Sequence, residues 1–289
     1  MATISPSSDE TTMTRLALTE HDGYFRFSRD QLRAAGAELH ERYRSAEPFP
    51  HIVLDNFISA DLLCKVADRY PDRAEKTFFD RPQERLKYQF GPGDIDYGPT
   101  LNLLAELNSD AFLTFLKELT GIKGLIPDPY FLGGGLHETR SGGHLSIHAD
   151  FNVHPRLKLQ RRLNLLIYLN DDWSEDFGGA LELWDREMQA CRVQVAPALG
   201  RAVIFNTDLD SYHGQPDPLA CPADRSRKSI ATYYYTAFED SVAAVPQRDT
   251  NFRPRRGERR DWSGTYKRFV ADWVPPRLQR VGHRLNPFR

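Results

Sequence analysis

Three histidines and one aspartate fall within eleven residues of this chain, in the segment HLSIHADFNVH (144–154). Side chains of a β-strand alternate between its two faces, so His148 and Asp150 would project to the same side, about 7 Å apart along the strand. That spacing suits two ligands of one metal ion, although an isolated H-x-D triplet is a weak signal. A third ligand follows later in the chain, because AVIFNTDLDSYHGQ delivers His213 from a strand and a turn.

A carboxylate receptor is indicated fourteen residues after His213, in RSRKSIATYYY. Arg227 and Ser229 would lie on the same side of a strand there, and a guanidinium with a hydroxyl suits a carboxylate. Two histidines and one carboxylate are also the ligand set of non-haem Fe(II) oxygenases, which leaves three coordination positions open. The sequence therefore predicts a metal centre at His148, Asp150 and His213, completed by a receptor for an anionic cosubstrate.

Together these motifs resemble the Fe(II)- and 2-oxoglutarate-dependent dioxygenases, in particular the prolyl-hydroxylase-like branch with its H-x-D … H … R-x-S signature. Further segments resemble that branch in the same order, over roughly residues 48 to 237: PFPHIVLDNFISADLL, SGGHLSIHADFN, RRLNLLIYLNDDW and GGALELWD. The resemblance implies that the triad holds Fe(II), that Arg227 and Ser229 hold the far carboxylate of 2-oxoglutarate, and that O2 is the other cosubstrate. Related halogenases lack the carboxylate ligand, so Asp150 argues against halogenation.

One departure from the family concerns the cosubstrate. Relatives often place a tyrosine about nine residues before the first metal histidine, where this chain has Thr139. Asn164 and Tyr168 in RRLNLLIYLN share strand parity and are alternative contacts to 2-oxoglutarate. Satisfaction of local hydrogen bonds is an equally open interpretation of both residues.

Other residues near these motifs are expected to have structural roles. We expect His137 to be structural, His144 to be a partly exposed strand residue, and His154 to lie at the surface or rim. The basic run 156–162 is interpreted as a solvated loop, and the aromatic run 233–235 as strand packing.

The elements that must position these residues can be read from periodicity. Apolar spacing predicts helices over 28–46, 59–70 and 101–119, with a short strand at 51–57. The Gly- and Pro-containing segment 72–100 is expected to be a long loop of the kind that often forms a lid. Short β-rich runs without βαβ alternation follow residue 120. We therefore predict a mainly β fold with flanking helices (α+β), a double-stranded β-helix or jelly-roll core with N-terminal helices packed on one side.

Charge divides the chain unevenly. The expected parts are a flexible N-terminus (1–20), a jelly-roll domain (21–247) and a basic helical extension (248–289). The extension holds eleven arginines and one lysine against four acidic residues, which gives it a net charge of +8. Because the whole chain has a net charge of −2, residues 1–247 have a net charge of −10. Apolar spacing over Thr265–Val274 favours a docked helix over a polyanion-binding arm, and nucleic acid is an unfavoured partner.

The spacing of the cysteines and the absence of a long apolar stretch indicate the compartment and the membrane association of the protein. Cys64, Cys191 and Cys221 have no C-x-x-C spacing, so neither a disulfide framework nor a thiolate zinc site is expected. A charged start without an apolar stretch, and no window of about 18 apolar residues, predict a cytoplasmic protein without a membrane span. The oligomeric state is left open.

The favoured function is a 2-oxoglutarate-dependent oxygenase that hydroxylates a small polar molecule or closes a ring in it, in natural-product or sugar tailoring. The acidic body leans toward a cationic or polyhydroxylated substrate. A protein or peptide side-chain hydroxylase is the alternative. A non-catalytic metal-binding jelly roll is less favoured, because a structural metal site has no use for Arg227 and Ser229. A nucleic-acid-binding protein would require steep salt dependence of binding.

Overall fold

The computed structural model describes residues 2–3, 15–74, 77–238 and 247–258. The chain divides into two compact units, residues 1–253 and 254–289. In the second unit, residues 254–258 are described, and there Arg255 Nε lies 2.7 Å from Glu258 Oε1. The helix predicted over Thr265–Val274 lies outside the described residues.

Four α-helices form in the described residues, all of them before residue 121. They are α1 (Arg29–Arg44), α2 (Ala60–Asp68), α3 (Gly98–Leu107) and α4 (Asp110–Thr120). The prediction of one helix over 101–119 is wrong, because the chain turns between α3 and α4. The Ser109 hydroxyl accepts a hydrogen bond from the Phe112 N–H and caps the start of α4, which satisfies one of the donors that a helix start leaves unpaired.

The strands form one large sheet and one separate hairpin. The hairpin pairs β2 (Leu18–His21) with β3 (Tyr24–Phe27). The large sheet contains β1 (Ala2–Thr3), β4 (His51–Leu54), β5 (Phe78–Arg81), β6 (Glu84–Phe90), β7 (Ile126–Pro127), β8 (Gly135–Ala149), β9 (Gln160–Tyr168), β10 (Leu181–Trp184), β11 (Cys191–Val195), β12 (Ala202–Asn206), β13 (His213–Gln215), β14 (Ser226–Thr236) and β15 (Asn251–Phe252). Its main path runs β1-β11-β10-β13-β8-β14-β9-β12-β4.

Strand β8 joins the two halves of this nearly closed, mainly antiparallel sheet. Its first part, residues 135–140, pairs with β14, and its last part pairs with β13 through Leu145 and His148. The last three residues of β8, Ile147, His148 and Ala149, are buried. The predicted fold class is confirmed, and the metal motif falls on the strand that links the two halves.

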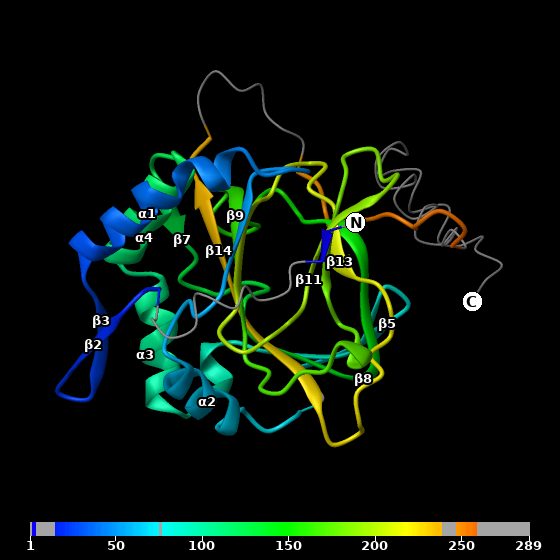
Figure 1. The fold of residues 1–289 in the computed structure, drawn as a ribbon, viewed down its shortest axis with the longest axis horizontal. Helices are drawn as coiled ribbons and strands as arrows, with labels where there is room; N and C mark the ends of the chain where they lie inside the picture. Colours follow the sequence, from blue (N-terminus) through cyan, green and yellow to red (C-terminus); the bar gives the residue numbers. More distant parts are fainter. Residues whose placement is uncertain (1, 4–14, 75–76, 239–246, 259–289) are drawn as a thin grey trace. The chain divides into compact units, whose positions relative to one another are not determined.

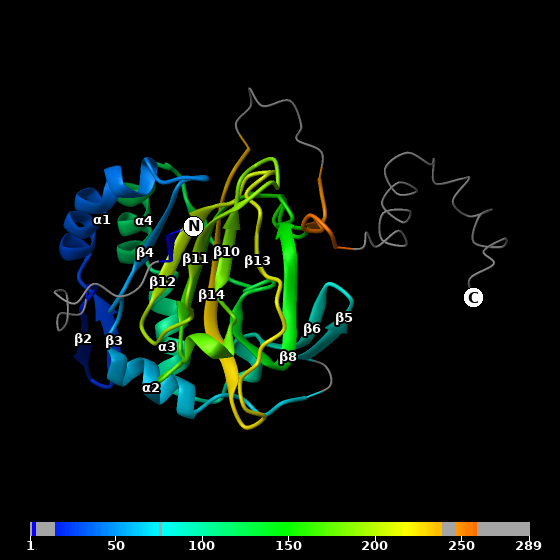
Figure 2. The same ribbon diagram turned by 45° about the vertical axis from the view of Figure 1, so that its right-hand side comes forward.

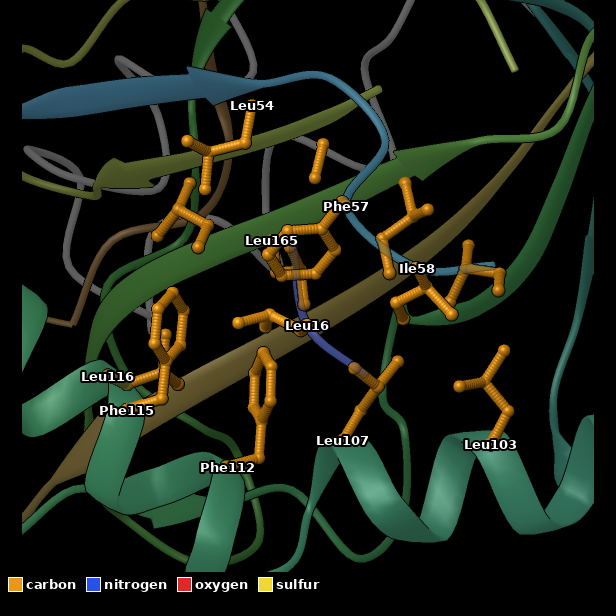
Figure 3. Packing of buried hydrophobic residues seen from close by; sticks show 14 of the residues in the cluster. Leu16, Leu54, Phe57, Ile58, Leu103, Leu107, Phe112, Phe115, Leu116 and Leu165 are labelled. Atoms are coloured by element: carbon orange, nitrogen blue, oxygen red, sulfur yellow. The ribbon is translucent and has the colours of Figure 1, made fainter. Parts of the chain in front are cut away.

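The helices cover one side of the sheet, as Figures 1 and 2 show for α1 and α4. Between helices and sheet lies an aromatic and aliphatic core in which Phe57, Phe112 and Phe115 meet with ring centroids 5.5 to 6.3 Å apart (Figure 3). Leu16 is buried in the same core, and its N–H donates to the Phe57 carbonyl. The chain is therefore anchored to the domain at Leu16, within the segment 1–20 that we expect to be flexible, because burial of the leucine side chain is favourable.

The segment 72–100, expected to be a long loop, contains a hairpin over residues 78–90. Strands β5 and β6 pair with each other, and β6 also pairs with β8 in antiparallel orientation (Figure 2). The pairing of Lys87 with Thr139 and of Gln89 with His137 brings β6 beside the metal-bearing strand. The long-loop prediction fails because strand pairing with a distant edge overrides the local turn residues. In the described residues, no helix is long and apolar enough to cross a membrane.

Candidate active site

Strands β8 and β13 bring the three predicted metal ligands together. His213 lies directly opposite His148 in the antiparallel register, and Asp150 follows β8 by one residue. Ligand atoms of all three residues lie within 4.8 Å of one another. His148 Nε2 is 3.6 Å from Asp150 Oδ1, and His213 Nε2 is 3.5 Å from Asp150 Oδ2. The three side chains converge on one point.

Backbone carbonyls determine which imidazole nitrogen faces that point. His148 Nδ1 lies 2.8 Å from the Ser146 oxygen, and His213 Nδ1 lies 2.9 Å from the Ser211 oxygen. A carbonyl only accepts, so each Nδ1 carries the proton and each Nε2 keeps its lone pair for a metal. Two such nitrogens with one carboxylate fit Fe(II).

The ionisation of the ligands agrees with metal binding. Burial and the neighbouring His148 lower the pKa of His213 to about 4, so the ring is neutral at pH 7. Burial alone would raise the pKa of Asp150, but Arg161, His213 and His148 lower it well below the ordinary value. A neutral imidazole and an ionised carboxylate are the forms that coordinate metal.

Arg227 lies in the same pocket, on β14 beside Thr139 of β8. Its Nε donates to the Gly179 oxygen at 2.7 Å, and its Nη2 donates to the Tyr168 hydroxyl at 3.2 Å. Ser229 is opposite Tyr168 in the register and is buried. A guanidinium held between fixed acceptors, with two hydroxyl groups nearby, is suited to receive a carboxylate.

Asn164 occupies a different part of the site from Tyr168. Its Nδ2 donates to Asp150 Oδ2 at 2.7 Å, and its Oδ1 accepts from Arg161 Nε and Nη2 at 3.0 and 2.7 Å. The two residues proposed from strand parity as cosubstrate contacts therefore separate, with Tyr168 at Arg227 and Asn164 at the metal ligand.

Arg161 is the site residue that sequence reasoning missed. We expected a solvated basic loop, yet its side chain is 2% exposed. The register of β9 with β14 shifts here, since Tyr234 pairs with Leu163 but Tyr235 pairs with Arg161. A bulge that absorbs Arg162 moves Arg161 to the face that Asn164 occupies. Strand parity alone could not have revealed this placement.

The pocket around the triad has a volume of about 200 Å³. One wall comes from β6, where Lys87 Nζ lies 2.8 Å from Glu84 Oε1 and both side chains are mostly buried. Burial alone would raise the pKa of Glu84, but the ammonium of Lys87 lowers it below its ordinary value. The wall therefore presents an ion pair to the pocket interior.

Another wall comes from β15, in residues that sequence analysis assigned to the C-terminal extension. Phe252 pairs with His148 in the β15–β8 register, and their ring centroids are 5.4 Å apart. The Arg253 N–H donates to the Ile147 oxygen at 2.8 Å, and Thr250 also lines the pocket. Residues 248–253 thus complete the edge of β8 and belong with the jelly roll.

Three further histidines lie on β8 or in the loop that follows it: His137, His144 and His154. His137 is buried and its Nε2 donates to the Gly133 oxygen, as expected for a structural residue. His144 is partly exposed, also as expected. The surface or rim position expected for His154 is wrong, since the side chain is fully buried. Its Nδ1 accepts from two backbone N–H groups of the turn 156–157, and its Nε2 lies 3.3 Å from Asp128 Oδ1. The loop after β8 folds back around it.

Comparison with known proteins agrees with this geometry. Residues 134–235 match the model of the 2OG-Fe(II) oxygenase superfamily, a segment that contains the triad and Arg227. A prolyl hydroxylase from Trichoplax adhaerens, in complex with a hypoxia inducible factor peptide fragment, is similar with a TM-score of 0.50 and 16% identity, over 71% of this chain and 91% of that chain. No curated protein matches the sequence.

Two further solved structures are reported for their fold. A prolyl 4-hydroxylase from Phytophthora capsici has a TM-score of 0.48 and 18% identity, over 76% of this chain and 70% of that chain. HygX from Streptomyces hygroscopicus, with nickel and 2-oxoglutarate bound, has a TM-score of 0.46 and 13% identity, over 75% and 96%. At these identities the likeness concerns the fold alone.

The sheet, the triad and the matched segment define a 2-oxoglutarate-dependent dioxygenase, whose metal and cosubstrates are Fe(II), 2-oxoglutarate and O2. Residues 134–235 are similar to the 2OG-Fe(II) oxygenase superfamily, and the fold is like that of a prolyl hydroxylase. The enzyme class and the cofactors predicted from sequence are confirmed.

Proposed function

We propose that this oxygenase hydroxylates a small polar molecule or closes a ring in it, as a step in tailoring a natural product or a sugar. One observation carries the proposal: the triad and Arg227 share a cavity of about 200 Å³. Ligand pockets are commonly about 300 to 1,000 Å³. A cavity below that range favours a small substrate over a peptide segment.

The residues divide the work between cosubstrate and metal. Arg227, with the hydroxyls of Tyr168 and Ser229, would hold the far carboxylate of 2-oxoglutarate and so orient the molecule in the pocket. His148, Asp150 and His213 would hold Fe(II). The bound pair supplies oxidative decarboxylation to succinate and CO2, coupled to oxidation of the substrate.

The side chains that line the pocket favour a polar substrate that also has an apolar part. The Glu84–Lys87 pair offers one acceptor and one donor group, and Gln215 adds an amide. Phe151 and Phe252 supply apolar surface in the same pocket. A few placed polar groups among apolar ones fix the orientation of a small ligand.

Succinate release tests the proposal. Purified enzyme with Fe(II), 2-oxoglutarate and O2 would be challenged with a panel of sugars, amino acids and small natural products, and with a matched panel of proline-containing peptides. We expect succinate formation to be stimulated by members of the small-molecule panel and to be lost in the Asp150→Ala variant.

Two results would overturn the proposal. Stimulation by peptides alone would move the substrate class to protein side chains. A metal-loaded enzyme that forms no succinate, with or without any of these compounds, would exclude oxygenase activity itself.

A further inference from the structure

Arg161 places a positive charge beside a metal ligand, inside the pocket. Its Nη2 lies 3.1 Å from Asp150 Oδ2, and both side chains are mostly buried. A buried guanidinium is costly unless its charge is paired and its N–H groups are hydrogen-bonded. The cost indicates that this pair is held in place by specific partners.

Three side chains form a closed triangle, in which two sides are hydrogen bonds and the third is the Arg161–Asp150 ion pair. Arg161 donates twice to Asn164 Oδ1, and Asn164 donates from Nδ2 to Asp150 Oδ2 at 2.7 Å. The Asp150 oxygen Oδ2 therefore accepts a hydrogen bond from Asn164 and is in an ion pair with Arg161. Both contacts are made to Oδ2, which distinguishes the two oxygens of the carboxylate.

Aromatic rings hold the guanidinium in its place. Its Cζ lies 3.6 Å from the ring centre of Tyr233 and 4.6 Å from that of Phe151. Cation–π contacts of this kind strengthen when the groups are desolvated. Arg161 therefore cannot turn away from Asp150 without losing its contacts with both rings.

We propose that Arg161 is a positioning residue that makes Asp150 a one-oxygen metal ligand. With Oδ2 held by Arg161 and Asn164, Oδ1 remains for the metal. A carboxylate that used both oxygens would take one more coordination position, whereas the facial triad must leave three open for cosubstrate and dioxygen. The inference rests on the metal centre of the proposed function and does not depend on the identity of the substrate.

Cobalt(II) is a suitable probe because the visible absorption of this ion reports the number and arrangement of its ligands. We would record the spectrum of the Co(II)-loaded enzyme before 2-oxoglutarate is added, and then titrate 2-oxoglutarate. The variants are Arg161→Met, which keeps an unbranched stem beside the two rings, and Asn164→Ala, which keeps the charge pair. Arg162→Met is the matched control, since Arg162 is the next residue and lies outside the pocket lining.

We expect Arg161→Met and Asn164→Ala to change the 2-oxoglutarate-free spectrum, and Arg162→Met to leave it as in the wild type. Loss of a partner that orients a metal ligand typically costs about 10- to 100-fold in affinity or activity, so 2-oxoglutarate should bind Co(II)-loaded Arg161→Met at least about 10-fold more weakly. Asn164→Ala decides the matter if Arg161→Met does not fold.

The spectrum separates positioning from other roles. If Asn164 only contacted 2-oxoglutarate, its variant would weaken cosubstrate binding and leave the 2-oxoglutarate-free spectrum unchanged. Spectra of both variants that superimpose on the wild type would overturn the inference. A wild-type protein that binds neither Co(II) nor 2-oxoglutarate would instead defeat the proposed function.

Discussion

His213 faces His148 across the β8–β13 pair, with ring centroids 4.5 Å apart, although the two residues are 65 positions apart in the sequence (213 minus 148). The register of two antiparallel strands therefore sets the distance between the metal ligands. Because both Nδ1 atoms are fixed by carbonyls of their own strand or turn, the site is organised by the backbone before any metal binds.

Removal of the Arg227 guanidinium should weaken 2-oxoglutarate binding. Hydrogen bonds to charged groups contribute about 1.5 to 3 kcal/mol each, so we expect Arg227→Ala to raise the KM for 2-oxoglutarate by roughly 10- to 150-fold. Affinity for Co(II) should be unchanged, since Arg227 touches no metal ligand in the described contacts. Arg225→Ala, two residues earlier and bonded to the Asp171 oxygen, is the control. An unaltered KM in Arg227→Ala would contradict the assignment.

The Phe252 ring should slow exchange of the metal. It lies 5.4 Å from the His148 ring and forms part of the pocket wall. Phe252→Ala opens that wall, and we expect Co(II) to pass to an added chelator several times faster than from the wild type. Phe79→Ala on β5, outside the pocket lining, should exchange at the wild-type rate. Equal rates for the two variants would show that β15 does not cover the site.

Acid should destabilise the fold partly through His137. Burial and the nearby Lys87 lower the pKa of His137 well below its ordinary value. Below about pH 6.5 the unfolded chain binds a proton at this histidine and the folded chain does not. The free energy of unfolding is therefore fully retained above that pH and falls as the pH drops, by up to about 1.4 kcal/mol per pH unit.

Urea unfolding at several pH values between 7.5 and 5 measures this effect. His137→Gln retains an amide donor for the Gly133 oxygen and cannot titrate, so its stability should fall less steeply with acid. His144→Gln, at a partly exposed position, should keep the wild-type slope. The same slope in all three proteins would assign the acid sensitivity to other groups.

Close packing of α1 on α4 should make substitution of Gly36 by any larger residue destabilising. Alanine is favoured over glycine in a helix by about 1 kcal/mol. At Gly36, however, a Cβ would lie 2.5 Å from the Phe115 carbonyl oxygen of α4. Overpacking costs about 1 to 3 kcal/mol, so we expect Gly36→Ala to lower the free energy of unfolding.

Gly98 provides the matched comparison in urea unfolding. It begins α3, and nothing lies within 4 Å of a Cβ added there. Gly98→Ala should be neutral or slightly stabilising. If Gly36→Ala had the same free energy of unfolding as Gly98→Ala, the prediction would be wrong, because α1 and α4 could then move apart at little cost in free energy.

The sequence by itself determined the fold class, and it predicted the three residues of the His–Asp–His cluster and the pair Arg227 and Ser229. His148 and Asp150 are two residues apart at a strand end, Arg227 and Ser229 are two apart within a strand, and α1 follows its apolar spacing. These features depend on local periodicity, which the chain carries in its residue order.

Only the tertiary structure decided the pairing of β6 and β15 with β8, the bulge that moves Arg161 to the pocket face, and the burial of His154. Edge pairing joins segments far apart in the chain, and a bulge of one residue reverses strand parity from that point on. Both depend on which distant strand is the neighbour, and no short stretch of residues carries that information. The walls of the pocket and the hydrogen bonds to Asp150 are therefore properties of the folded sheet.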